Sequence, residues 1–259
     1  MYNPISLTFL GTGTSQGIPV VGSKHPVCLS DDPRDTRLRV SVLIQWGNTN
    51  VVVDCGPDFR QQMLRIGIDK LDAVLMTHEH NDHMAGLDDV RPFNFIQKNA
   101  IPLYCSSRTL KAVKTRFPYI FDLVDKYPGA PSIEPILIRP YKNFDIAGKQ
   151  ITPIEAMHGN LPVIGFKLDN MAYMTDVKRL DIKAKKELKN LDLLVLSALR
   201  IEPHQMHLNL EEALGLIEEL SPKRTYLTHI SHMMGFHAEV DKQLPNSIHL
   251  AYDQLKIQL

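Results

Sequence analysis

Apolar residues along the chain gather in short runs, most of them bounded by Gly, Pro, Asn or Asp. Runs of this kind between turn-forming residues are typical of β-strands. They predict strands at 6–10, 40–45, 50–54, 73–77, 101–104, 151–155, 163–168, 172–175, 193–196, 225–228 and 248–252.

Helical spacing of apolar residues appears between these runs and predicts helices over 59–66, 180–188 and 210–220. The last is the clearest, because its N-terminus has Asn209 followed three residues later by Glu212, the pattern of a capping box. Pro222 lies just beyond its end, where the helix must stop. Residues 107–135 have the least regular pattern, and turn-forming residues at 127–131 predict an exposed insertion.

Strands and helices alternate without a linker-like or low-complexity segment. This pattern predicts one α/β domain over residues 1–259. An apolar fraction of 44% is sufficient for a packed core.

Charge and cysteine content limit the expected partners and location of the protein. Lys plus Arg equals Asp plus Glu at 29 each, so no overall positive field favours a nucleic acid partner. No apolar stretch approaches the roughly 20 residues of a membrane span, and no secretory signal pattern is visible, so no membrane partner is expected. Three cysteines argue against a disulfide framework and favour the cytoplasm.

The chemistry is concentrated in a histidine cluster directly after the predicted strand at 73–77. Here His78, His80, Asp82 and His83 offer four metal-ligand side chains within six residues. In extended backbone, His78 and His80 point to the same side, and Asp82 and His83 can turn back from a following helix through 85–87. An exposed polar turn with accidental histidines explains this spacing poorly, so the cluster predicts a metal site.

The His-x-His-x-Asp-His motif resembles that of the metallo-β-lactamase superfamily. That family's later ligands are single His, Asp and His residues at strand ends, which match His158, Asp176 and His229 in order and context. Asp54 matches an early aspartate that usually supports the histidine loop. The resemblance implies a four-layer αββα sandwich with metal ions at one sheet edge.

The resemblance also implies a division of ligands between two divalent ions. One ion takes His78, His80 and His158, the second takes Asp82, His83 and His229, and Asp176 bridges them. Imidazole and carboxylate ligands suit Zn²⁺ or Mn²⁺. Two such ions about 3.5–4 Å apart can hold a hydroxide, which makes hydrolysis the expected reaction.

Three further stretches, 11–19, 54–60 and 228–232, look like those of PhnP-type phosphodiesterases, relatives of the ribonuclease Z group. This similarity implies hydrolysis of a small, cyclic phosphodiester. It gives His207, beside the helix start at Asn209, a place near the metals, where a protonated imidazole could stabilise phosphorane charge or protonate the leaving oxygen. His207 and Asp82 are therefore the expected catalytic residues, whereas His204 is expected to be exposed.

Positively charged residues are candidate phosphate contacts. Arg60, Arg91 and Arg200 follow structured segments, although a single arginine is more often a structural ion-pair partner. Two lysine- and arginine-rich strips, at 111–116 and 178–186, are explained by solvated helix faces. The long Gly/Pro-rich arm with which many ribonuclease Z enzymes grip tRNA is not evident, which favours a small substrate.

The glycine-rich stretch 11–28 lacks both the dinucleotide fingerprint and the P-loop Gly-Lys-Ser/Thr. PhnP-type relatives carry three cysteines here, which bind a structural zinc with a distant histidine. This chain has Ser23, His25 and Cys28 at those positions, with His232 as the distant partner. His25, Cys28 and His232 are a candidate second zinc site, and a hydrogen-bonded loop without metal is the favoured alternative.

Other functions share parts of this pattern. Thioester and lactone hydrolases use the same ligands, and a ribonuclease Z-like RNA phosphodiesterase uses the same chemistry. The diiron redox branch tends to replace a motif histidine with a carboxylate, whereas position 80 is His. A non-catalytic scaffold would be expected to lose ligands, and all seven are present. The resemblance also allows a homodimer.

Overall fold

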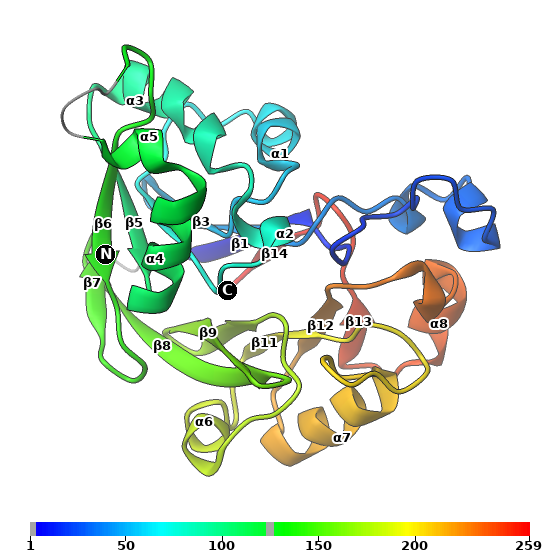
Figure 1. Ribbon diagram of the computed structural model, residues 1–259. Coiled ribbons are helices and arrows are strands. Elements are labelled where there is room, and N and C mark those ends of the chain that lie inside the picture. The colour runs from blue at the N-terminus through cyan, green and yellow to red at the C-terminus, as the bar shows by residue number, and fades with distance from the viewer. Residues whose placement is uncertain (1–3, 123–126) are drawn as a thin grey trace. The chain divides into compact units, whose positions relative to one another are not determined.

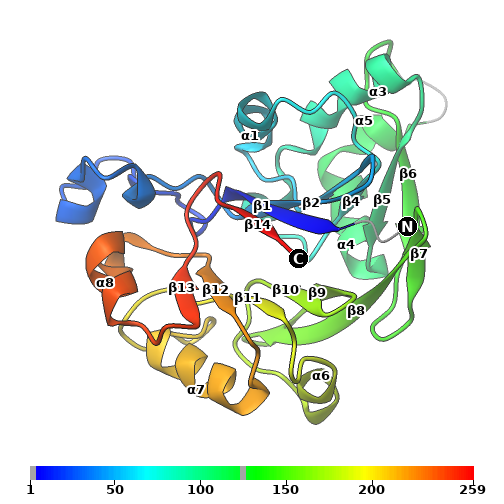
Figure 2. The same ribbon diagram turned by 180° about the vertical axis from the view of Figure 1, so that it is seen from behind.

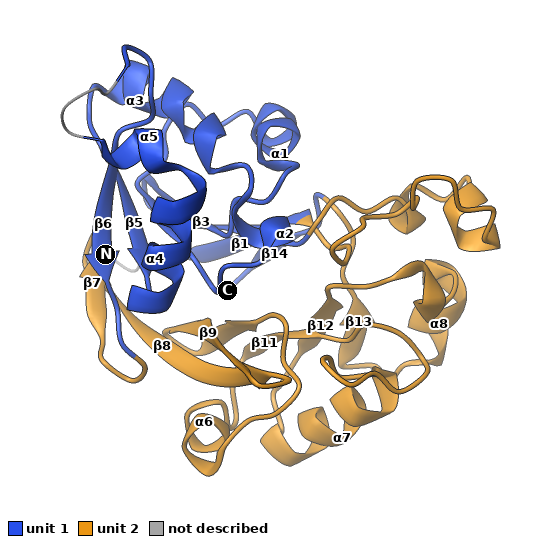
Figure 3. Ribbon diagram, in the orientation of Figure 1, with its two compact units in different colours: residues 1–10, 40–139, 254–259 blue, residues 11–39, 140–253 orange. Residues whose placement is uncertain are grey.

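The computed structural model describes residues 4–122 and 127–259. The chain forms two compact units (Figure 3), each assembled from stretches that are distant in sequence. Unit 1 comprises residues 1–10, 40–139 and 254–259, and unit 2 comprises residues 11–39 and 140–253.

Unit 1 is built on a seven-stranded mixed sheet in the order β14-β1-β2-β3-β4-β5-β6 (Figure 2). Its strands are β1 (Ile5–Gly11), β2 (Ser41–Trp46), β3 (Thr49–Val53), β4 (Ala73–Leu75), β5 (Ile101–Cys105), β6 (Ile133–Leu137) and β14 (Lys256–Gln258). Strands β3 to β6 are parallel, while the β1–β14 and β2–β3 pairs are antiparallel. The parallel strands β3 and β4 are almost entirely buried and apolar, as expected for a sheet covered on both faces.

Short helices follow the parallel strands of unit 1 (Figure 1). They are α1 (Phe59–Ile66), α2 (Asn81–Met84), α3 (Arg91–Gln97), α4 (Ser107–Arg116) and α5 (Pro118–Phe121), with a 3-10 turn at Leu87–Val90. Their apolar faces join the sheet in one core, in which Phe59, Leu87 and Val113 are fully buried beside Val52 and Val74. Burial of such side chains stabilises the unit by about 1.5–3 kcal/mol each before the entropy cost of folding.

Unit 2 contains a second seven-stranded sheet, in the order β13-β12-β11-β10-β9-β8-β7. Its strands are β7 (Phe144–Ile146), β8 (Lys149–His158), β9 (Leu161–Leu168), β10 (Met171–Met174), β11 (Leu193–Ser197), β12 (Thr225–Thr228) and β13 (Ile248–Leu250). Strands β10 to β13 are parallel, and β7 to β10 form an antiparallel meander.

The helices of unit 2 are α6 (Ile182–Glu187), α7 (Leu210–Leu220) and α8 (His237–Gln243), with 3-10 turns at Pro26–Leu29, Pro33–Asp35 and His232–Met234. The capping box of α7 is confirmed: the Asn209 side chain accepts from the Glu212 amide, and the Glu212 carboxylate accepts from the Asn209 amide. Ala213, Ile217 and Leu220 form its buried stripe.

Every strand expected from the apolar runs is present, with ends that differ by a few residues, and the three expected helices are present. Residues 107–135 are more regular than their pattern indicates, because they contain α4, α5 and the start of β6. The turn expected at 127–131 is present, and Tyr127 and Pro128 are exposed. Residues 123–126 lie outside the described part of the chain. Between 85 and 87 the chain leaves α2 and enters a 3-10 turn instead of continuing as a helix. Among residues 4–122 and 127–259, no helix is long and apolar enough to cross a lipid bilayer.

Candidate metal centre

The predicted site residues follow the carboxyl ends of strands. In unit 1, β3 and β4 are parallel and Val53 is paired with Leu75, so Asp54 and Thr77 come to the same sheet edge. In unit 2, β10 and β12 run in the same direction and are followed by Asp176 and His229. Strand β8, which ends at His158, also runs in that direction, because both β8 and β10 are antiparallel to β9.

Left-handed backbone marks three of these positions. Asp54, Asp176 and His229 have φ values of 64°, 55° and 57°, which non-glycine residues adopt at a cost. Such conformations persist where surrounding contacts fix them, and they concentrate at functional sites.

In unit 1, Asp54 and Thr77 fix the histidine loop. The Asp54 carboxylate accepts hydrogen bonds from the Thr77 amide at 2.8 Å, the Thr77 hydroxyl at 2.8 Å and His83 Nδ1 at 2.7 Å. Because the Thr77 hydroxyl donates to Asp54, its oxygen accepts from His78 Nδ1 at 3.0 Å. These contacts confirm the supporting role expected for Asp54, and they direct Nε2 of both histidines away from the support.

Burial and the neighbouring hydrogen-bond donors shift the pKa of the Asp54 carboxyl in opposite directions. Burial raises the pKa of the Asp54 carboxyl, while the neighbouring His83 and the hydrogen bonds from His83 and Thr77 lower it. Asp54 is fully buried, so its charge is stabilised by these donors and not by water.

The other members of the loop lie beside this pair. The His78 ring centroid lies 4.6 Å from that of His80 and 4.1 Å from that of His83. The Asp82 carboxylate is 3.3 Å from His83 Nε2. Unit 1 therefore brings together all four residues of the predicted motif.

In unit 2, the Asp176 carboxylate faces two histidines. Its Oδ1 lies 3.2 Å from His229 Nε2, and its Oδ2 lies 3.9 Å from His158 Nε2. His158 donates from Nδ1 to the Met206 carbonyl at 2.8 Å, which leaves Nε2 as its ligand atom. One carboxylate oxygen toward each imidazole is the arrangement that a bridging ligand requires.

His207 belongs to this group. Its ring stacks on His229 with centroids 4.9 Å apart and lies 4.4 Å from the ring of His158. Ligand atoms of Asp176, His207 and His229 lie within 4.8 Å of one another. Burial lowers the pKa of His207 to about 3, so its resting form is the neutral imidazole and not the expected imidazolium. His204 was expected to be exposed, yet it is only half-exposed and lies 5.2 Å from the His207 ring.

The donor sets of both units fit divalent metal ions. Three histidines have Nδ1 occupied by a defined oxygen partner, namely Thr77 for His78, Asp54 for His83 and Met206 for His158. Such partners fix the tautomer and orient Nε2 for coordination. Imidazole nitrogens together with carboxylate oxygens are the ligands preferred by Zn²⁺ and accepted by Mn²⁺.

The candidate structural zinc site is only partly assembled. The His25 and His232 rings meet edge to face with centroids 4.9 Å apart. His25 Nδ1 accepts from the Val27 amide at 3.3 Å, and Cys28 Sγ accepts from the Val20 amide at 3.5 Å. Within the described residues, Cys28 belongs to no group of three ligand atoms within 4.8 Å of one another. The hydrogen bonds fit the alternative of a loop without metal, and zinc binding here stays a prediction.

The candidate phosphate contacts differ in their environments. Arg200 donates to the carbonyl oxygens of Glu202 and Pro203, which curls the loop that carries His207. Arg91 is paired with Asp88 at 3.0 Å, as expected for a structural ion pair. Arg60 is exposed on α1.

Sequence reasoning missed two supports of the site. Thr77 precedes the histidine motif directly, and its hydroxyl beside a histidine was a usable signal. The Met206 contact is made by a backbone carbonyl, so no residue type could have indicated it.

A family model for the β-lactamase superfamily domain matches residues 49–230. A match of this extent, together with the fold and the histidine motif, shows that the chain belongs to the metallo-β-lactamase superfamily, and the predicted fold class is confirmed. Within it, the chain belongs to the PhnP- and ribonuclease Z-like branch. A solved structure of a diphosphatase from the PhnP family is 39% identical, covers 99% of this chain and 97% of its own, and has a TM-score of 0.92.

Two curated relatives carry different names. An octanoyltransferase of Porphyromonas gingivalis is 39% identical over 249 residues, which are 95% of this chain and 50% of that protein. A ribonuclease Z of Bradyrhizobium diazoefficiens is 32% identical over 84 residues, which are 32% of this chain and 23% of that protein. The chain thus spans about half the length of the first relative and less of the second.

Proposed function

We propose that the chain is a dinuclear metal-dependent phosphodiesterase that hydrolyses a small, cyclic phosphodiester. The observation that carries this proposal is the prior orientation of the ligands: His78, His83 and His158 each direct Nε2 away from a fixed Nδ1 partner. Surface histidines have no need of such partners, whereas metal ligands depend on them.

The proposed ligands are the seven residues of the sequence prediction: His78, His80, Asp82, His83, His158, Asp176 and His229. Zn²⁺ or Mn²⁺ ions, when bound, would supply Lewis acidity and an activated water for attack on phosphorus. Asp54 and Thr77 hold the histidine loop in one conformation, so that the loop needs little reorganisation when metal ions bind.

His207 is the proposed catalytic partner of these ligands, together with Asp82. Its ring lies against both His158 and His229, and Nδ1 is buried without a hydrogen-bond partner among the described residues. A neutral imidazole at this place can donate a hydrogen bond to a phosphoryl or leaving-group oxygen. The negative charge of a bound phosphodiester would favour this donation.

The phosphodiester class is supported by the similarity to a diphosphatase from the PhnP family and to a ribonuclease Z. The net charge of zero supports a small substrate over a long nucleic acid. Scarce cysteine supports a cytoplasmic location. A homodimer stays a prediction.

Acyl transfer or thioester hydrolysis is the second candidate, because the octanoyltransferase relative is 39% identical. About half of that protein has no counterpart in this chain, so its named activity can belong to the unmatched half. The alternative of a thioester or lactone hydrolase therefore stays open to the same assay.

Purified protein loaded with Zn²⁺ or Mn²⁺ should hydrolyse bis(p-nitrophenyl) phosphate and ribose cyclic phosphates. The same preparation should leave an octanoyl thioester and a lactone intact. Turnover of the thioester or lactone without any phosphodiesterase activity would overturn the proposal. Asp176→Ala should lose activity and bind fewer than two ions per chain, since it removes the proposed bridge. Two ions per chain with full activity in that variant would refute the ligand assignment.

A further inference from the structure

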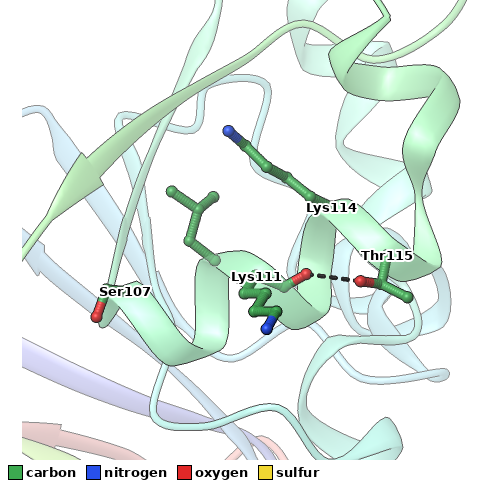
Figure 4. A pocket seen from close by; sticks show the side chains of 5 residues that line it. Ser107, Lys111, Lys114 and Thr115 are labelled. Atoms are coloured by element: carbon green, nitrogen blue, oxygen red, sulfur yellow. Dashed lines mark hydrogen bonds between the residues drawn. The ribbon is translucent and has the colours of Figure 1, made fainter.

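A hollow of about 350 Å³ lies in unit 1 directly beside the histidine loop. It is lined by Glu79, Arg108, Lys111, Ala112, Thr115 and Arg116. Glu79 is the residue between His78 and His80, and all the other lining residues belong to α4. A second hollow of about 380 Å³, whose lining residues are drawn in Figure 4, shares Lys111 and Thr115 with the first.

The α4 side of these hollows carries only positive charge. The exposed residues of α4 include Arg108, Lys111, Lys114 and Arg116, and the helix contains no acidic residue. Within the part of the chain that the structure describes, Lys111, Lys114 and Arg116 form no ion pair with a carboxylate. Thr109 and Val113 occupy the buried face, so the helix has its apolar contact on one side and its cations on the other.

One ion pair connects this helix to the histidine loop. Arg108 Nε donates to the Glu79 carboxylate at 2.7 Å, and 15% of the Glu79 side chain is exposed. This ion pair neutralises Glu79, the only acid among the residues lining the hollow. The positive charges of Lys111 and Arg116 are therefore not neutralised by a lining residue. The ion pair also fixes the position of α4 relative to two of the proposed metal ligands.

We propose that this hollow, defined by Lys111, Arg116 and their neighbours on α4, binds a phosphate group of the substrate other than the one that is cleaved. The proposal rests on the proposed function, because the reaction centre it serves is the histidine loop. Lysine and arginine are the side chains that bind phosphate oxygens most strongly, through charge-assisted hydrogen bonds. Lys111 and Arg116 are five residues apart, a rise of about 7.5 Å along the helix, and both line the same hollow, so their long side chains can reach one phosphate group between them.

The site therefore predicts a preference for substrates that carry a second phosphate. A matched pair of chromogenic esters tests it: thymidine 5′-(p-nitrophenyl phosphate) with and without a 3′-phosphate. Wild-type protein should show a higher kcat/KM for the 3′-phosphorylated ester. Substitution of Lys111→Ala with Arg116→Ala should abolish this advantage, about a tenfold effect, mainly by raising KM.

The ester without the second phosphate serves as the internal control, and the double variant should hydrolyse it as the wild type does. Lys142→Ala, which removes an exposed lysine of unit 2, should leave both esters unaffected. Arg108 is left in place because of its bond to Glu79. Equal losses on the two esters, or an unchanged preference in the double variant, would overturn the subsite.

A binding measurement separates this proposal from the proposed function. Inorganic tripolyphosphate should bind metal-free wild-type protein in a calorimetric titration at low salt, and the double variant should bind it about tenfold more weakly. If neither ester is hydrolysed but this difference is present, the proposed function fails and the anion subsite stands. Absence of binding to the wild type, or equal binding by the double variant, would overturn the subsite whatever the activity.

Discussion

Substitution of Gly56 tests how tightly the histidine loop is supported. Gly56 follows Asp54 and Cys55, and an alanine Cβ at this position would lie 1.9 Å from the Asp82 carbonyl oxygen. Ordinary van der Waals contact begins near 3.4 Å, so the two groups would have to separate by about 1.5 Å. The obstacle is backbone, which cannot rotate away as a long side chain can.

The surrounding backbone resists this separation. The Cys55 amide donates to the His83 carbonyl at 2.8 Å, and the Gly86 amide donates to the Cys55 carbonyl at 2.9 Å. Overpacking of this kind costs about 1–3 kcal/mol in the free energy of unfolding, and lost hydrogen bonds would add to it. Because Asp82 and His83 move with the loop, metal affinity should fall by about 10–100-fold.

Gly215→Ala is the matched control. Gly215 lies inside α7, and an added Cβ meets no atom within 4 Å, so alanine should stabilise the protein by about 0.5–1 kcal/mol. Urea unfolding followed by circular dichroism gives both free energies, and elemental analysis after dialysis gives metal content. A Gly56→Ala variant that unfolded within about 0.5 kcal/mol of the wild type and kept its metal would show that Gly56 is not required at this position.

Three further predictions address the Asp54 support, the buried His237 of unit 2 and the proposed catalytic histidine. Asp54→Asn should weaken zinc binding about 10–100-fold, because the amide is a poorer acceptor than the carboxylate for His83 Nδ1. Chelator competition measures the zinc affinity, and an unchanged affinity would contradict this prediction. Burial, followed by the charge of Arg37, lowers the pKa of His237 from 6.5 to about 4. The unfolded chain then binds this proton at higher pH than the folded chain, so stability is retained above pH 6.5 and lost as pH falls toward 4. In His237→Gln, denaturation midpoints over that interval should vary less with pH than in the wild type, and equal slopes would argue against the assignment. His207→Ala should lower kcat about 10²–10⁴-fold with metal content retained, whereas an unchanged kcat would remove His207 from the reaction.

The strands that sequence analysis missed share one property. Strands β6 and β14 lie at the two edges of the unit 1 sheet, and β7 lies at an edge of the unit 2 sheet. Edge strands bury less surface, so their apolar pattern is weak, and β6 also contains Pro135, which an edge strand tolerates. Their sequences are therefore close to those of loops.

Helix α4 was missed for a related reason. Its buried face includes Thr109 and Val113, and no long apolar stripe marks the helical period. The Ser106 cap, whose hydroxyl accepts from the Thr109 amide, was the available signal. The basic strip at 111–116 was expected to be a solvated helix face, and its lysines and arginine are exposed on α4. The structure adds that Lys111 and Arg116 also line a hollow beside Glu79.

The sequence by itself determined the central strands, the candidate ligand types and the order of the histidine motif, because these depend on local patterns of burial and on residue chemistry. Tertiary structure alone decided how those ligands are oriented. The backbone is left-handed at Asp54, Asp176 and His229. The hydrogen bond of His158 to the Met206 carbonyl and the ion pair of Arg108 with Glu79 join residues that are distant in sequence. Such contacts leave no local pattern, since they exist only after the strands have paired and their ends have met.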